Sequence, residues 1–278
     1  MRLLKQLVVV AVVAFGGSQA VAAVDGNTFL TLTFGVATAV LSLLAYAWVV
    51  RKTEKRDPDE VGRRGAAKAL GRGTVLGLGL FAAVILNIAL LGDYRVAGWG
   101  SVAGAIALLG FMAAAATTEE LLFRGVLFRN VEKRFGTWIA LSGTGLLFGL
   151  VHLFNPHASL WGAVAIAIEA GGMLGAAYVA TRRLWLPIGL HFGWNWAEGG
   201  LFGTGVSGTD GPQGLLHGVT SGPTLITGGD FGPEASLYSV LAGLIVTVVF
   251  MMLARRRGHL VARRRRGTPE TAPATLAR

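Results

Sequence analysis

The chain has 278 residues, of which 53% are hydrophobic and only 14% are charged, and it contains several apolar runs long enough to cross a bilayer. This composition excludes an ordinary soluble globular protein. The absence of cysteine excludes disulfides, thiolate zinc sites and a cysteine nucleophile, so any catalysis must use oxygen or imidazole groups. The formal charge of +10 would suggest nucleic acid in a soluble protein, but here it must be assigned loop by loop against a membrane, and we expect no nucleic-acid partner.

Eight apolar runs predict an all-α fold, a polytopic bundle of about eight transmembrane helices. In chain order the runs cover 6–24, 28–50, 74–92, 96–118, 137–154, 160–181, 184–200 and 237–254. The first run also reads as a signal peptide with a small-residue cleavage site, and its removal would leave seven helices. We therefore expect three parts: an N-terminal helix or signal peptide (1–24), a membrane-embedded domain (25–254) and a basic tail (255–278) that is disordered.

The basic residues predict the orientation of the bundle. With the N-terminus inside, Arg95 is the one residue among 25 Lys and Arg that falls outside, as the positive-inside rule demands. An even number of spans then makes the C-terminus cytoplasmic, and 51–72 becomes a solvated cytoplasmic loop or surface helix. Abundant Arg, Ala and Gly are typical of a GC-rich bacterial genome. We expect an integral protein of the bacterial plasma membrane, with the lipid bilayer as its partner.

Ionisable residues interrupt these apolar runs, although a charge at the membrane centre costs about 2.5 to 3.5 kcal/mol and so usually marks a site or pathway. Glu120 and Arg124 are four residues apart with Glu first, the favourable order for a helical ion pair. Glu119 then points about a quarter turn away, free for another partner. Glu169 and Glu198 lie in later runs.

Glu119 and His152 are equidistant from the polar turn 132–136, each about 16 residues or 24 Å away along a helix. In an antiparallel hairpin they would lie at equal depth and could meet side by side. A carboxylate beside an imidazole can hold and deprotonate a water molecule. His191 and Asn195, four apart on one helical face, form a donor pair that could stabilise an oxyanion. These four residues together predict a hydrolysis site.

Three motifs carry a family resemblance: Glu-Glu-x-x-x-Arg at 119–124, Phe-x-x-x-His at 148–152 and His-x-x-x-Asn at 191–195. In this order, on separate spans, they resemble the CAAX-protease and bacteriocin-processing family of intramembrane endopeptidases. The stretches 152–159 and 171–195 are also similar to that family, so the resemblance covers about 100–200.

The resemblance implies that Glu119 is the water-activating base, that His152 assists it, and that His191 and Asn195 stabilise the oxyanion. Structural support of the site would come from Glu120, Arg124 and Phe148. The substrate would be a membrane-associated peptide or protein, lipidated or not. The family is often described as metalloproteases, and a site of Glu119, His152 and His191 can be drawn with or without a divalent metal such as zinc.

Three features depart from the family pattern, and two other function classes stay open. Arg182 and Arg183 occupy a turn where small polar residues are expected. Glu169 could tune the site or pair with another helix, and the Gly-rich loop 199–236 could be a lid or a tolerated insertion. Buried carboxylates and histidines also mark proton-coupled transporters. A catalytically idle scaffold or immunity protein could use the same fold to bind a partner.

Overall fold

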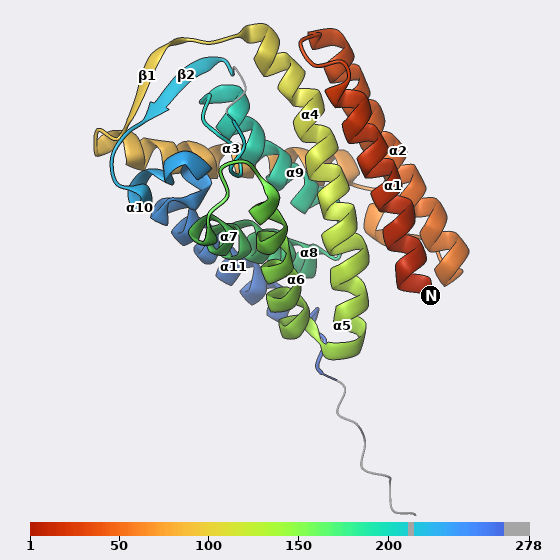
Figure 1. The fold of residues 1–278 in the computed structure, drawn as a ribbon. Coiled ribbons are helices and arrows are strands. Elements are labelled where there is room, and N and C mark those ends of the chain that lie inside the picture. The colour runs from red at the N-terminus through yellow and green to blue at the C-terminus, as the bar shows by residue number, and fades with distance from the viewer. Residues whose placement is uncertain (211–213, 264–278) are drawn as a thin grey trace, which may run out of the picture.

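The computed structural model describes residues 1–210 and 214–263. The predicted all-α membrane bundle is confirmed, since seven helices of the described chain are long and apolar enough to cross a membrane (Figure 1). The long helices are α1 Arg2–Ala22, α2 Thr28–Glu54, α3 Ala66–Leu90, α4 Val102–Glu120, α6 Thr137–Val151 and α11 Leu237–Arg256. The shorter ones are α5 Arg129–Phe135, α7 Leu160–Ile166, α8 Met173–Thr181, α9 Trp185–Asn195 and α10 Thr224–Thr227.

Segments of π-helix lie within two of the long spans and at the end of α9. Leu121–Phe128 joins α4 to α5 in one continuous span, and Ala167–Gly172 joins α7 to α8 in another. Trp196–Leu201 continues α9. Single π-turns inside helices are frequent at functional sites, because the wider turn re-aims the side chains on either side of it. These three segments adjoin or contain the buried acidic residues that the sequence analysis singled out.

The prediction of a span over 96–118 is wrong at its start. Residues Tyr94–Trp99 form strand β1, which pairs antiparallel with β2, Leu216–Thr220, and the helix begins only at Val102. The side chain of Ser101 caps it by accepting a hydrogen bond from the Gly104 amide. Hydropathy alone cannot distinguish a short apolar strand from the first turns of a helix. The span predicted at 74–92 differs in the opposite direction, because its helix begins earlier than predicted, at Ala66.

The segment predicted at 184–200 packs very closely against α3. Glycines face backbone at each crossing point: a Cβ on Gly77 would lie 2.2 Å from the Leu190 carbonyl oxygen, and one on Gly193 2.2 Å from that of Thr74. Small residues permit this approach, as is usual between membrane helices. The α9 helix is too short to count among the seven long spans, but the packing holds it rigidly within the bundle.

The segment 51–72 is less solvated than predicted. The side chains of Glu54 and Glu60 are only 4% and 5% exposed, and both pair with Arg129, at 2.6 Å and 3.5 Å. At the other end of the chain, the amide of Val261 donates to the Thr137 hydroxyl at 2.8 Å, so part of the predicted tail packs on the bundle. The rest of that tail, residues 264–278, lies outside the described residues.

Candidate active site

The hairpin formed by α4, α5 and α6 brings Glu119 and His152 to one cavity. Its turn lies at Gly136, as the symmetry of the two motifs predicts. A cavity of about 1010 Å³ is lined by both residues and by Asn195. The side chain of Glu119 is 33% exposed to this space, whereas that of Glu120 is fully buried. The two neighbouring glutamates therefore have different surroundings, one open to the cavity and one inside the protein.

Glu120 and Arg124 form the predicted ion pair. An Nη1–Oε1 distance of 2.5 Å joins the two side chains, which are 0% and 2% exposed. Arg124 also donates from Nη2 to the carbonyl oxygen of Ala170 at 2.8 Å, and its guanidinium lies 4.6 Å from the ring centre of Phe148. Because a buried charge without a partner is costly, this pair depends on both members. Through the hydrogen bond from Arg124, the pair also ties the span of α4 to the span that contains Ala170.

His191 lies between the two glutamates. Its Nδ1 is 3.2 Å from Oε1 of Glu120, and its Nε2 is 3.8 Å from Oε2 of Glu119. The ring is buried and meets the Phe148 ring edge to face at 6.1 Å. Since the Glu120 carboxylate accepts from Arg124, the simplest arrangement has His191 donating its Nδ1 hydrogen to the same carboxylate. Its Nε2 then faces Glu119 and the cavity.

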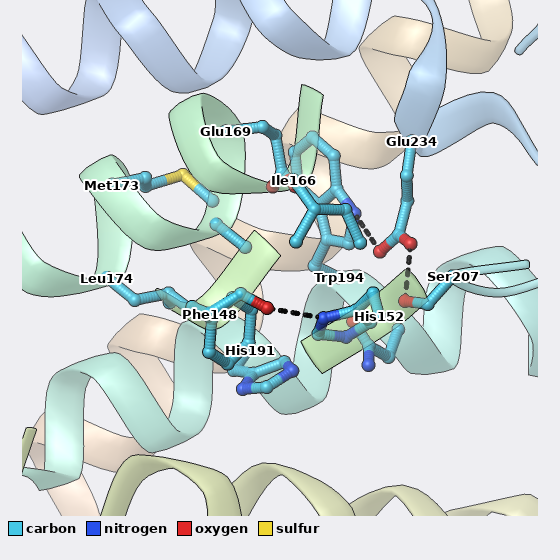
Figure 2. Close-up of a pocket in the computed structure, with 12 residues that line it drawn as sticks. Phe148, His152, Ile166, Glu169, Met173, Leu174, His191, Trp194, Ser207 and Glu234 are labelled. Atoms are coloured by element: carbon cyan, nitrogen blue, oxygen red, sulfur yellow. Dashed lines mark hydrogen bonds between the residues drawn. The ribbon is translucent and has the colours of Figure 1, made fainter. Parts of the chain in front are cut away.

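The tautomer of His152 follows from its neighbour. Its Nδ1 is 2.7 Å from the carbonyl oxygen of Phe148, one turn earlier in the same helix (Figure 2). A carbonyl oxygen can only accept, so Nδ1 carries the hydrogen. The Nε2 lone pair of neutral His152 is therefore free to accept a hydrogen bond, as a residue that orients a water molecule requires. Phe148 supports the ring further, with centroids 4.9 Å apart.

A small inner cavity lies behind these residues. It has a volume of about 10 Å³ and is lined by His152, His191 and Asn195 together with Glu169, Ser207 and Glu234. Figure 2 labels five of these polar residues around the cavity: His152, Glu169, His191, Ser207 and Glu234. Its volume is close to the minimum of about 10 to 15 Å³ that one water molecule needs.

Ser207 and Glu234 line this cavity but are not among the residues predicted for the site. Ser207 donates from its hydroxyl to Oε2 of Glu234 at 2.6 Å, and Trp194 donates from Nε1 to Oε1 at 3.1 Å. The amide of Asn155 holds the Ser207 carbonyl at 2.6 Å. Ser207 and Glu234 both belong to the Gly-rich loop, where no periodic pattern of apolar residues marks a buried position. The loop therefore contacts the site and is more than a distant insertion.

Glu169 and Glu198 are buried without full hydrogen bonding. Glu169 is 1% exposed and its Oε2 has no partner, while Glu198 is 0% exposed and neither of its oxygens has a donor. Of the two alternatives for Glu169, the cross-helix ion pair is not found within residues 1–210 and 214–263. Its place beside His152 and His191 instead agrees with a role in tuning the site.

The residues present do not fit a metal ion as they stand. In the described part of the chain, no group of three or more His, Asp and Glu side chains is arranged to hold one. The mechanism proposed for the site uses only the protein's own side chains.

The fold and the site together define a polytopic membrane protein with a glutamate–histidine site enclosed among its helices. Residues 101–197 match the family described as Rce1-like, type II CAAX prenyl endopeptidase Rce1-like. This segment carries all three motifs, so the match supports the CAAX-protease family that these motifs resemble. Neither a search of curated proteins nor one of solved structures found a match to the chain.

Proposed function

We propose that the protein hydrolyses peptide bonds of membrane-associated peptides or proteins, with Glu119 as the general base. The observation that carries the proposal is the contrast between the two adjacent glutamates. Glu119 is 33% exposed at the cavity, and its neighbour is fully buried and neutralised by Arg124. Glu119 is thus the carboxylate that water and substrate can reach.

In the proposed reaction, a water molecule is held between Glu119 and the free Nε2 of His152. Glu119 takes one proton from this water as its oxygen bonds to the carbonyl carbon of the substrate. The carbonyl oxygen becomes negatively charged. Asn195 is one donor available to it, and His191 is a second when its Nε2 carries a hydrogen as well as its Nδ1, the doubly protonated ring being held between Glu119 and Glu120. Donors fixed in a water-poor site stabilise such charge strongly. Glu119 then passes its proton to the peptide nitrogen, the carbon–nitrogen bond breaks, and the amine leaves.

Glu120, Arg124 and Phe148 would act as positioning residues. Glu120 orients His191 through Nδ1, and Arg124 fixes Glu120. Phe148 contributes a carbonyl to His152 and a ring surface to Arg124. Neither lipid modification nor a particular sequence of the substrate is required by this mechanism.

The test is a cleavage assay on detergent-purified protein with lipidated and unlipidated peptide libraries. We expect Glu119→Gln and His152→Ala each to lower kcat by about 10²- to 10⁴-fold, the usual contribution of general acid–base groups. Matched controls are Asp59→Asn and His217→Ala, two exposed side chains outside the cavity, which should leave kcat unchanged. Undiminished cleavage by both site variants would exclude the proposed site. Uncoupler-sensitive ion flux without cleavage would favour a transporter.

A further inference from the structure

The large cavity opens at one end of the bundle. Its rim is formed by Asp25 and Asn27 in the α1–α2 connection, Ser101 before α4, Asn155 after α6 and Asp210 in the Gly-rich loop. In Figure 1 the α1–α2 connection and the start of α4 both lie at the top, away from α5. Every one of these rim segments joins helices at the same end of the bundle. We call this the mouth end.

One face of α4 connects the mouth to Glu119. Ala103, Ala107, Phe111 and Ala115 line the cavity at intervals of four residues, and Glu119 follows at the same interval. Residues four apart lie on one side of a helix, so this stripe is continuous and about 24 Å long from Ala103 to Glu119. The wall is apolar until it reaches the catalytic carboxylate. A peptide entering at the mouth could lie along it.

The opposite end of the bundle is closed by ion pairs between separate segments. Arg129 meets Glu54 at 2.6 Å, and Arg182 meets Glu132 at 2.5 Å. Arg183 donates to backbone carbonyls of the α2–α3 connection. None of these five side chains lines the cavity that contains Glu119. Within residues 1–210 and 214–263, this end ties the helices together without lining the cavity.

The charges distinguish the two ends by side of the membrane. In the connections of the mouth end, at 23–27, 91–101, 152–159 and 202–236, Arg95 is the single Lys or Arg. The connections of the opposite end contain Lys55, Arg56, Lys133 and the Arg182–Arg183 pair among others. Positively charged connections stay in the cytoplasm. The mouth end therefore faces away from the cytoplasm.

We infer that the substrate reaches Glu119 from the noncytoplasmic side, so that it is a peptide segment exposed on that face of the membrane with an apolar stretch that lies along α4. This inference rests on the proposed function. The rim adds a preference in charge, because it presents the carboxylate of Asp25 and that of Asp210, whose Oδ1 lies 2.7 Å from Nε2 of His157, and the residues that line the cavity include no Lys or Arg. A neutral or basic segment suits it better than an acidic one.

The experiment uses single-cysteine variants of a chain that has no cysteine of its own. Leu91→Cys reports the mouth end and Arg134→Cys the opposite end, and both side chains are exposed and lie outside the cavity. Intact cells that express each variant are treated with a membrane-impermeant maleimide. We expect labelling of Leu91→Cys in intact cells and of Arg134→Cys only after permeabilisation. The reverse result would overturn the orientation.

Access of the substrate to the site is then tested in proteoliposomes. The vesicles are sorted into two groups according to which of the two cysteine reporters can be labelled from outside. A membrane-impermeant peptide that the detergent-purified protein cleaves is added externally. We expect cleavage by vesicles with the mouth end outward and loss of cleavage by those in the opposite orientation. If the detergent-purified protein cleaves nothing, the proposed function fails; if it cleaves but only the opposite orientation is active in vesicles, this inference alone fails.

Two neighbouring residues of α4 supply a matched test of the path. Ala107 lines the cavity, and Ile106 is 40% exposed on the outside of the bundle. We expect Ala107→Trp to fill the path and abolish cleavage, and Ile106→Trp to leave it unchanged. Normal cleavage by a folded Ala107→Trp protein would show that substrate does not pass along α4.

Discussion

Breaking the Glu120–Arg124 pair tests whether the site is held together by a buried charge. Arg124→Met keeps most of the side-chain volume but leaves the Glu120 carboxylate, 0% exposed, without its cation. Removing one partner of a buried pair costs about 3 to 5 kcal/mol, because the remaining charge stays desolvated. We expect a large drop in the thermal unfolding midpoint of the detergent-purified protein. Glu120, the partner of His191, is then no longer fixed by Arg124, so cleavage should fall as well.

The double variant Glu120→Gln/Arg124→Met separates stability from activity. With no uncompensated charge left, we expect most of the lost stability to return, a coupling of several kcal/mol between the two positions. Activity should not return, because the Gln side chain cannot hold a protonated His191 as a carboxylate does. The reasoning is refuted if Arg124→Met unfolds at the temperature of the wild type. It is equally refuted if the double variant is as unstable as the single one.

Four further outcomes are expected. Asn195→Ala should lower kcat by about 10²- to 10³-fold as an oxyanion donor is lost, while Asn87→Ala on an exposed face should not, in the same peptide assay. Burial opposes ionisation of Glu60, but the hydrogen bond from Arg56, the charge of Arg129 and the hydrogen bond from Tyr46 together outweigh it and lower the pKa of this carboxyl from its ordinary value of 4.5. A carboxyl whose pKa is lowered on folding stabilises the fold at pH values above its ordinary pKa, and this stabilisation is lost as the pH falls through its folded-state pKa. The loss of stability with falling pH should therefore be shallower in Glu60→Gln than in the wild type. Glu198→Gln should unfold at the same or a higher temperature than the wild type, since neither carboxylate oxygen has a donor. Finally, cleavage should survive treatment with a chelator such as EDTA; its loss, and recovery on adding zinc, would contradict the arrangement of side chains described here.

The sequence by itself determined the membrane bundle and two of the contacts at the candidate site, because these depend on regular geometry. Long apolar runs can satisfy their backbone in lipid only as helices, which is why the spans are visible without a structure. The ion pair of Glu120 and Arg124 needs only a spacing of one helical turn. The meeting of Glu119 and His152 at one cavity needs only equal distances from the turn of the hairpin. Both relations follow from 3.6 residues per turn and 1.5 Å per residue.

Tertiary structure alone decided which groups meet across distant segments. His191 lies 3.2 Å from Oε1 of buried Glu120 and 3.8 Å from Oε2 of partly exposed Glu119, although it is 71 residues away from Glu120 in the sequence. The contacts of Ser207 with Glu234 and Asn155 join loops whose sequences carry no periodicity. Strand β1 forms where hydropathy favoured a helix. The sequence around β1 could not predict this, because its partner strand lies more than a hundred residues away. Local patterns report local geometry, whereas these contacts depend on how the helices pack.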